Sequence, residues 1–267
     1  MAPFDHARVL TLASKFAAEL YRRWNSLRGM VRERVVENDT YQLAADGGRS
    51  GAPQFNFTTD AEKVSDFMNW YRSHVESDVL EPVGERQLHD GGHWTAKYLR
   101  DANASGIRDA GTRIRKAGGT PNLGRDEIDR IFNLPVRTDQ LASLYQRTFR
   151  ELKGITEATG QQISRELSDA LSEGENPRTV ASRINDRIDK IGITRSRTLA
   201  RTELGRSYNH ASLLRYERNG IDETRIENTH PCSQCKPFVG VIYTLAEAKG
   251  ILPIHPNCMG AWVPVIG

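Results

Sequence analysis

Apolar residues recur every three or four positions through most of this chain, which is the spacing of one face of an α-helix. The pattern predicts a first amphipathic helix over residues 6–36 and a second that opens at the capping pair Thr59 and Glu62. A third helix is predicted over residues 93–116. The most sustained apolar stripe follows, from Leu141 to Leu171, and predicts a long spine helix.

Two more helices are predicted after the spine. One begins at Asn176 and Pro177, an N-cap residue and a first-turn proline, and the other covers residues 194–219. Beyond Gly220 the helical spacing stops, and short β-prone runs separated by proline and glycine take its place. The sequence therefore predicts a mainly α fold, in which long amphipathic helices precede a small α+β C-terminal module.

We expect this chain to divide into three parts. Residues 1–58 would form an N-terminal helix and a mobile linker, because the end of this stretch is rich in glycine, serine, aspartate and proline. Residues 59–220 would form a helical domain around the spine helix. Residues 221–267 would form the small C-terminal module.

Composition narrows the class of protein. The chain has 267 residues and a net charge of +3, which is too small by itself to indicate nucleic-acid binding. Its apolar runs fall far short of the roughly 20 residues that a membrane-spanning helix needs, so we expect no contact with a membrane. The first residues lack the features of a secretory signal, so we expect synthesis and assembly in a cytoplasm.

Positive charge is concentrated in one stretch of predicted helix. Between Arg178 and Arg218 there are ten arginine or lysine residues and four acidic residues. A phosphate-rich partner would suit this stretch, although a solvated helix face or a protein contact explains it as well. The candidate nucleic-acid contacts are Arg183, Arg187, Arg195 and Arg197.

The chemistry of the C-terminal module is more specific. Cys232 and Cys235 form a C-x-x-C pair, and His255 and Cys258 form an H-x-x-C pair after 19 intervening residues. Two such pairs supply four soft ligands, which suits a structural zinc ion in a zinc-knuckle module. A metal-free thiol cluster and a redox C-x-x-C remain alternatives, but a redox role is disfavoured because no βαβ pattern surrounds the pair.

An enzymatic interpretation is also available for the same cysteines. Pro231 with Cys232 and Cys235 matches half of the zinc nucleoside deaminase signature. The other half requires a ligand two residues before a glutamate, whereas His210 is followed by Ala211 and Ser212. Four protein ligands would also leave no open metal position for water, so we expect a structural site, no small-molecule substrate and no enzyme activity.

The chain resembles a known family over about residues 145–267. The residues that carry the resemblance are, in order, Leu199, Ala200, Arg201, Thr202, Glu203, Tyr208, Asn209, Ala211, Tyr216, Gly220, Cys232, Cys235, Gly240, His255, Pro256, Asn257, Cys258, Val263, Pro264 and Val265. In combination they resemble the phage Mu F-like minor head proteins, or head-morphogenesis proteins, of tailed viruses. The chain departs from the family at Gly260, where members commonly have a further cysteine, and at Thr229 and His230, near which members commonly have an acidic residue.

The resemblance implies a minor capsid protein that lies near the portal vertex or in the capsid interior of a virion. Its expected partners are the portal protein, the major capsid protein or both, and packaged DNA, and its expected role is in head assembly and genome packaging or delivery. The competing hypothesis is a zinc-knuckle nucleic-acid-binding protein, because of the arginine-rich helix.

Among the residues of the last long helix that carry the resemblance, three are candidate structural or interface residues. We expect Arg201 and Glu203 to anchor the C-terminal module to the helix through a salt bridge or a cap, with direct contact to a partner as the alternative. We expect Asn209 to form hydrogen bonds with a loop.

Overall fold

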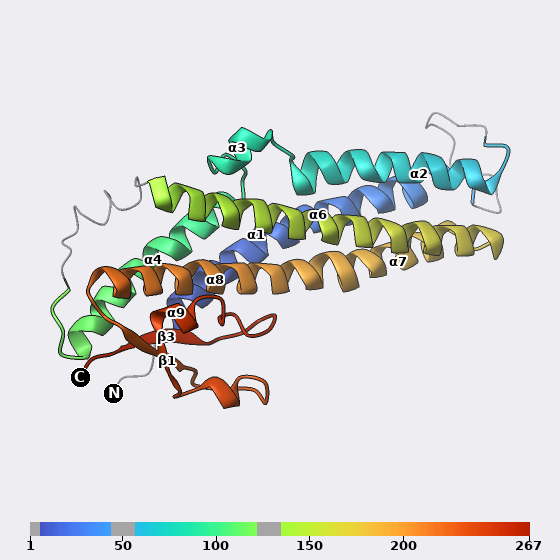
Figure 1. Ribbon diagram of the computed structural model, residues 1–267. Helices are drawn as coiled ribbons and strands as arrows, with labels where there is room; N and C mark the ends of the chain where they lie inside the picture. The colour runs from blue at the N-terminus through green and yellow to red at the C-terminus, as the bar shows by residue number, and fades with distance from the viewer. Residues whose placement is uncertain (1–5, 44–56, 122–134) are drawn as a thin grey trace. The chain divides into compact units, whose positions relative to one another are not determined.

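The computed structural model describes residues 6–43, 57–121 and 135–267 (Figure 1). The expected mainly α-helical fold with a small C-terminal sheet is confirmed. Most of the expected linker lies at residues 44–56, outside the described residues. The elements are, in order, α1 (His6–Arg32), η1 (Glu33–Glu37), α2 (Asp60–His74), η2 (Val75–Leu80), α3 (Glu85–His89), α4 (Ala96–Lys116), α6 (Pro135–Ser172), α7 (Pro177–Arg187), η3 (Ile188–Ile193), α8 (Thr194–Arg218), β1 (Glu223–Glu227), η4 (Lys236–Phe238), β2 (Ile242–Thr244), α9 (Leu245–Ala248) and β3 (Ala261–Val265).

The chain forms two compact units, and they differ from the three parts expected from the sequence. One unit comprises residues 1–17, 83–149 and 198–267, and the other comprises residues 18–82 and 150–197. The helices α1, α6 and α8 each contribute residues to both units. A long helix can pack its apolar face against different neighbours along its length.

Local signals explain where several helices begin. The Thr59 side chain accepts a hydrogen bond from the backbone of Glu62, and the Glu62 carboxylate accepts one from the backbone of Thr59, so the predicted capping box opens α2. Asn176 accepts a hydrogen bond from the backbone N–H of Thr179 at the start of α7. No helix among the described residues combines the length and the apolar character that a bilayer-spanning segment requires.

In the second unit, most arginines of α1 and η1 form ion pairs with carboxylates. Arg23 lies 2.6 Å from Glu81, and Arg34 lies 2.5 Å from Asp66. Arg23 is itself buried, so its aliphatic part also belongs to the core. Arg23 and Arg34 therefore join α1 and η1 to α2 and the segment after η2 through ion pairs.

In the first unit, a three-stranded antiparallel sheet in the order β2-β1-β3 forms the C-terminal module. In the central strand, Thr224 pairs with Tyr243 on one side and with Pro264 on the other. Pro264 lies on the edge strand β3, where the missing N–H of proline is tolerated.

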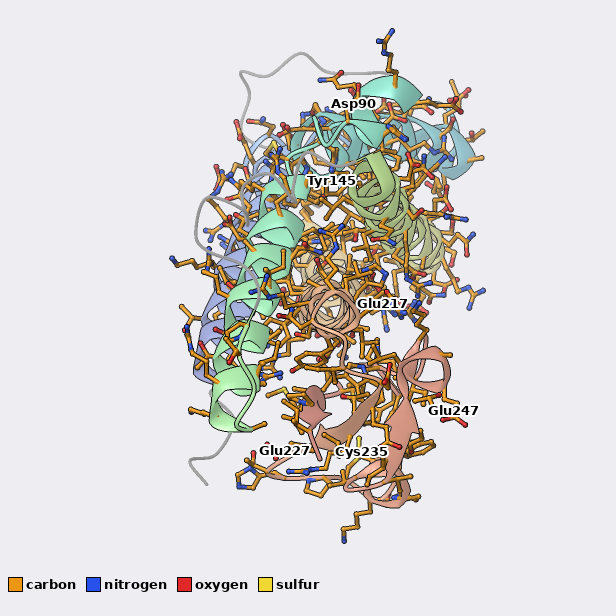
Figure 2. All side chains as sticks on the ribbon, turned by 60° about the vertical axis from the view of Figure 1, so that its left-hand side comes forward. Asp90, Tyr145, Glu217, Glu227, Cys235 and Glu247 are labelled. Carbon is orange, nitrogen blue, oxygen red and sulfur yellow. The ribbon has the colours of Figure 1, made fainter. Side chains whose placement is uncertain are left out.

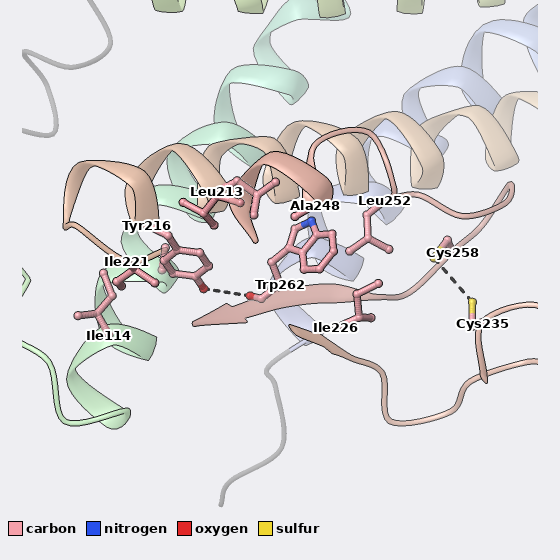
Figure 3. Packing of buried hydrophobic residues seen from close by; sticks show 12 residues of the cluster. Ile114, Leu213, Tyr216, Ile221, Ile226, Cys235, Ala248, Leu252, Cys258 and Trp262 are labelled. Atoms are coloured by element: carbon pink, nitrogen blue, oxygen red, sulfur yellow. Dashed lines mark hydrogen bonds between the residues drawn. The ribbon is translucent and has the colours of Figure 1, made fainter. Parts of the chain in front are cut away.

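The apolar core of this module continues into two helices (Figure 3). The core cluster contains Ala110 and Ile114 of α4, Leu213 and Tyr216 of α8, and, from the module, Ile226, Cys235, Leu245, Ala248, Leu252, Cys258 and Trp262. The module therefore shares its apolar core with α4 and α8. Apolar packing on the helices contributes to its folding along with any metal.

Candidate metal centre

Three of the four predicted ligands meet at one point of the module. The Nε2 atom of His255 lies 3.2 Å from the sulfur of Cys232 and 3.0 Å from the sulfur of Cys235. All three ligand atoms lie within 4.8 Å of one another, so these side chains could hold a metal ion. Cys235 lies inside the module, with Glu227 and Glu247 on either side of it in the view of Figure 2.

The fourth predicted ligand, Cys258, adjoins this group from the buried side. Its sulfur lies 3.9 Å from the sulfur of Cys235, and both side chains are buried (Figure 3). Cys258 is outside the three-atom group that lies within 4.8 Å. The structure therefore brings the two sequence pairs together, with Cys235 as the residue that contacts both members of the second pair.

Each pair is shaped by a tight turn. In the first, the backbone N–H groups of Cys235 and Lys236 donate to the carbonyl of Cys232, at 3.1 and 3.0 Å. In the second, the N–H of Cys258 donates to the carbonyl of His255 at 3.1 Å. Two-residue spacing within each pair lets these turns direct both side chains of a pair to the same side.

The orientation of His255 fits a metal ligand. Its Nδ1 lies 2.7 Å from the carbonyl oxygen of Pro256. A carbonyl only accepts hydrogen bonds, so Nδ1 carries a proton, and in the neutral imidazole the lone pair of Nε2 then faces Cys232 and Cys235. This is the tautomer that binds a metal through Nε2.

The two cysteines of the first pair differ in their acidity. The backbone N–H of Cys235 stabilises the thiolate of Cys232 and lowers the pKa of Cys232 to about 7. Burial raises the pKa of Cys235 to about 12. Because a metal binds the thiolate, metal binding at this site would release a proton from Cys235.

Side chains of α8 hold the segment that carries the second pair. Asn209 donates to the carbonyl of Gly260 at 3.0 Å and accepts from the N–H of Trp262 at 3.2 Å. The N–H of Asn257 donates to the hydroxyl of Thr202 at 3.1 Å. Asn209 therefore forms the kind of loop hydrogen bonds that we expected for it.

The other two predicted α8 residues behave differently from the expectation. Glu203 is buried and pairs with Arg147 of α6 at 3.1 Å and with Arg206 at 3.5 Å, so it anchors α6 and α8 to each other and does not anchor the module. Arg201 is exposed and has no ion pair among the residues that the structure describes. The expected salt bridge from Arg201 and Glu203 to the module is wrong, because Glu203 faces α6.

The four candidate nucleic-acid contacts fall into two pairs. Arg183 lies 2.6 Å from Glu175, and Arg187 lies 2.8 Å from Glu166, so the charges of both guanidinium groups are already balanced. Arg195 and Arg197 are exposed and have no ion pair within the described ranges. Two of the four arginines are therefore ion-paired and two are exposed without an ion pair, so the four are not alike as candidate contacts.

A partly buried hydrogen-bond network was missed by the sequence reasoning. Arg113 of α4 donates to the carbonyl of Trp262 and, at 2.6 Å, to the hydroxyl of Tyr208. The Tyr208 hydroxyl donates to Asp109 at 3.0 Å, and Tyr216 donates to the same Trp262 carbonyl at 3.0 Å. Charged residues at the end of a predicted helix gave no sign of burial, so no signal in the sequence singled out Arg113.

Comparisons of the chain with protein-family models, with curated proteins and with solved structures found no significant match.

Proposed function

We propose that this chain is a minor capsid or head-morphogenesis protein of a tailed virus, a structural component near the portal vertex that acts in head assembly and genome packaging or delivery. Its partners would be the portal protein, the major capsid protein or both. The proposal rests on the resemblance of residues 145–267 to the head-morphogenesis family. It also rests on a fold in which long helices carry a small C-terminal module with a candidate metal site.

One observation gives this proposal its physical support. The residues that carry the resemblance are scattered over the sequence, yet several of them contact one another. Asn209 binds the backbone next to β3, Thr202 binds Asn257, and His255 lies against Cys232 and Cys235. A set of residues that forms one connected unit is a more specific likeness than the same residues would be as isolated matches.

We also propose that the metal is zinc, held by Cys232, Cys235, His255 and Cys258 in a structural role. A tetrahedral zinc ion with Zn–S of ~2.3 Å and Zn–N of ~2.0–2.1 Å places its ligand atoms about 3.5–3.8 Å apart. The observed separations of 3.0, 3.2 and 3.9 Å are close to these values. Cys258 lies outside the group of atoms within 4.8 Å of one another, so its side chain would have to move closer to the other ligands to complete the tetrahedron.

The test of the head-protein proposal is the composition of purified virus particles that encode this chain. Quantitative mass spectrometry should find the chain in the particles at far fewer copies than the major capsid protein, with cross-links to the portal protein. Its absence from the particles, or a copy number equal to that of the major capsid protein, would overturn the proposal.

A matched pair of variants links the metal to this role. Cys235→Ser removes the central ligand, whereas Ser233→Ala changes an exposed neighbour in the same turn. We expect Cys235→Ser to reduce incorporation into particles and Ser233→Ala to leave it unchanged.

The second candidate function, a zinc-knuckle nucleic-acid-binding protein, draws on the exposed Arg195 and Arg197. A dedicated binder should lose DNA affinity steeply as salt rises. The logarithm of its binding constant should fall with the logarithm of the salt concentration, with a slope of about −0.9 per phosphate contact. A steep slope that falls in the Arg195→Ala and Arg197→Ala variants would favour this alternative. Weak binding with no effect of either variant would leave the head protein as the better proposal.

A further inference from the structure

We propose that Thr202 of α8, assisted by Thr198 one turn earlier, is a positioning residue of the metal centre. The two hydroxyl groups hold the turn between His255 and Cys258, so that ligation by these two residues depends on docking against α8. This inference rests on the metal centre proposed above. It adds that metal binding is coupled to the docking of this turn against α8.

The contact is made through the residue that lies between the two ligands. The backbone N–H of Asn257 donates to the hydroxyl oxygen of Thr202 at 3.1 Å, and the Asn257 side-chain amide donates to the hydroxyl of Thr198 at 3.4 Å. Thr202 donates its own proton to the carbonyl of Thr198 at 2.8 Å. This donation fixes the hydroxyl so that a lone pair is free to accept from Asn257.

The backbone of Asn257 makes this support necessary. Its φ of 63° is in the left-handed region, which costs free energy for any residue with a side chain, although asparagine tolerates it better than most. Hydrogen bonds from both the backbone and the side chain of Asn257 to α8 offset that cost. Since the same turn directs His255 and Cys258, loss of the bonds would let both ligands move.

The two halves of the metal centre are thus held in different ways. The positions of Cys232 and Cys235 are set by their own turn, in which backbone N–H groups donate to the carbonyl of Cys232. His255 and Cys258 are shaped by a turn that is fastened to α8 through Thr202. A metal ion would join the two halves, so its binding and the docking of the turn should stabilise each other by the same factor.

The test compares three single variants in the full chain. Thr202→Val keeps the shape and removes the hydroxyl acceptor, Thr202→Ser keeps the hydroxyl, and Asn257→Gly keeps the positive φ and the backbone bond while removing only the bond to Thr198. Zinc affinity is measured by competition with a chromophoric chelator. Circular dichroism of each variant confirms that its helices are intact.

We expect Thr202→Val to weaken zinc binding by about tenfold or more with unchanged stoichiometry, in the range seen when groups that orient metal ligands are removed. Thr202→Ser should bind as the wild type does, and Asn257→Gly should lose less than Thr202→Val. In addition, zinc should slow hydrogen exchange at the Asn257 amide in the wild type and do so less in Thr202→Val.

Equal zinc affinity of wild type and folded Thr202→Val would overturn the positioning role while leaving the metal centre intact. If Thr202→Val does not fold, the exchange measurement on the wild type decides, because a zinc-independent Asn257 amide overturns the coupling. A wild-type chain that binds no zinc would instead contradict the metal centre itself, before any variant is compared.

Discussion

Gly106 of α4 lies directly against the backbone of Tyr208 of α8. A Cβ atom at Gly106 would lie 2.3 Å from the carbonyl oxygen of Tyr208 and 3.0 Å from the Cβ of Ala211. The hydroxyl of Ser212 also donates to the Gly106 carbonyl at 3.3 Å. The two helices therefore approach each other with no space for a side chain at this position, and the C-terminal module packs on both of them.

This approach predicts opposite effects of alanine at the two glycines inside α4. Gly106→Ala should lower the free energy of unfolding by about 2 kcal/mol or more, because overpacking a close helix contact typically costs about 1–3 kcal/mol and the clash here is with backbone. Gly111→Ala, whose Cβ would meet nothing nearer than 3.7 Å, should raise it by about 0.5–1 kcal/mol through helix propensity. Urea unfolding followed by circular dichroism measures both. Equal effects of the two substitutions would contradict the close approach.

Asn209 should be far more important for stability than Arg201 on the same helix. Asn209→Ala leaves the Gly260 carbonyl and the Trp262 N–H buried without partners, which should cost about 2–6 kcal/mol at ~1–3 kcal/mol for each unsatisfied group. Arg201→Ala, at an exposed position, should change stability by less than about 0.5 kcal/mol. Thermal or urea unfolding of the two variants gives the comparison, and a stable Asn209→Ala would show that these hydrogen bonds matter little.

Substitutions of Arg147 and of the buried Glu203 should have coupled effects on stability, because the two side chains form an ion pair. Arg147→Ala should destabilise the protein by roughly 1–3 kcal/mol, less than for a fully buried pair because Arg147 is 44% exposed and Arg206 remains near the carboxylate. Combined with Glu203→Gln, the double variant should lose less than the sum of the two single losses. The control is Lys153→Ala, which breaks only an exposed pair on α6 and should cost under about 0.5 kcal/mol. Strict additivity of the two losses would exclude a direct interaction.

The lowered pKa of Cys232 predicts selective chemistry in the metal-free protein. The alkylation rate of Cys232 should rise about tenfold per pH unit below pH 7 and level off above pH 7. The thiolate is the reactive form, and the pKa of Cys232 is lowered to about 7. Cys235 should stay protonated through this range, because its pKa is raised to about 12. Alkylation by iodoacetamide, mapped by mass spectrometry between pH 5 and pH 9 (about the range in which the protein is expected to stay folded), should modify Cys232 first. Preferential modification of Cys235 would contradict the assignment, and added zinc should protect both residues.

The sequence predicted the helices well because their apolar spacing is local information. The spine helix was expected from Leu141 to Leu171, and α6 covers Pro135–Ser172. A short helix was missed even though its signal was present: Thr244 and Glu247 form a capping box at the start of α9. The same rule that predicted the start of α2 would have predicted α9.

Long-range relationships were not predictable from the same patterns. The division into units and the balanced charges of Arg183 and Arg187 depend on which elements pack together, and a charge count along the chain does not contain that information. Four ligand candidates were visible because cysteine and histidine spacing within a turn is local. The groups that hold that turn, such as Thr202 against Asn257, are 55 residues apart in the sequence, and nothing in the sequence pairs them.

The most direct test of the metal centre is zinc-edge X-ray absorption on the full chain loaded with zinc and freed of excess metal. We predict one zinc per chain, with three sulfur ligands at ~2.3 Å from Cys232, Cys235 and Cys258 and one nitrogen ligand at ~2.0–2.1 Å from His255. A folded chain that retains no zinc, or a bound zinc with fewer than three sulfur ligands, would contradict the four-ligand site.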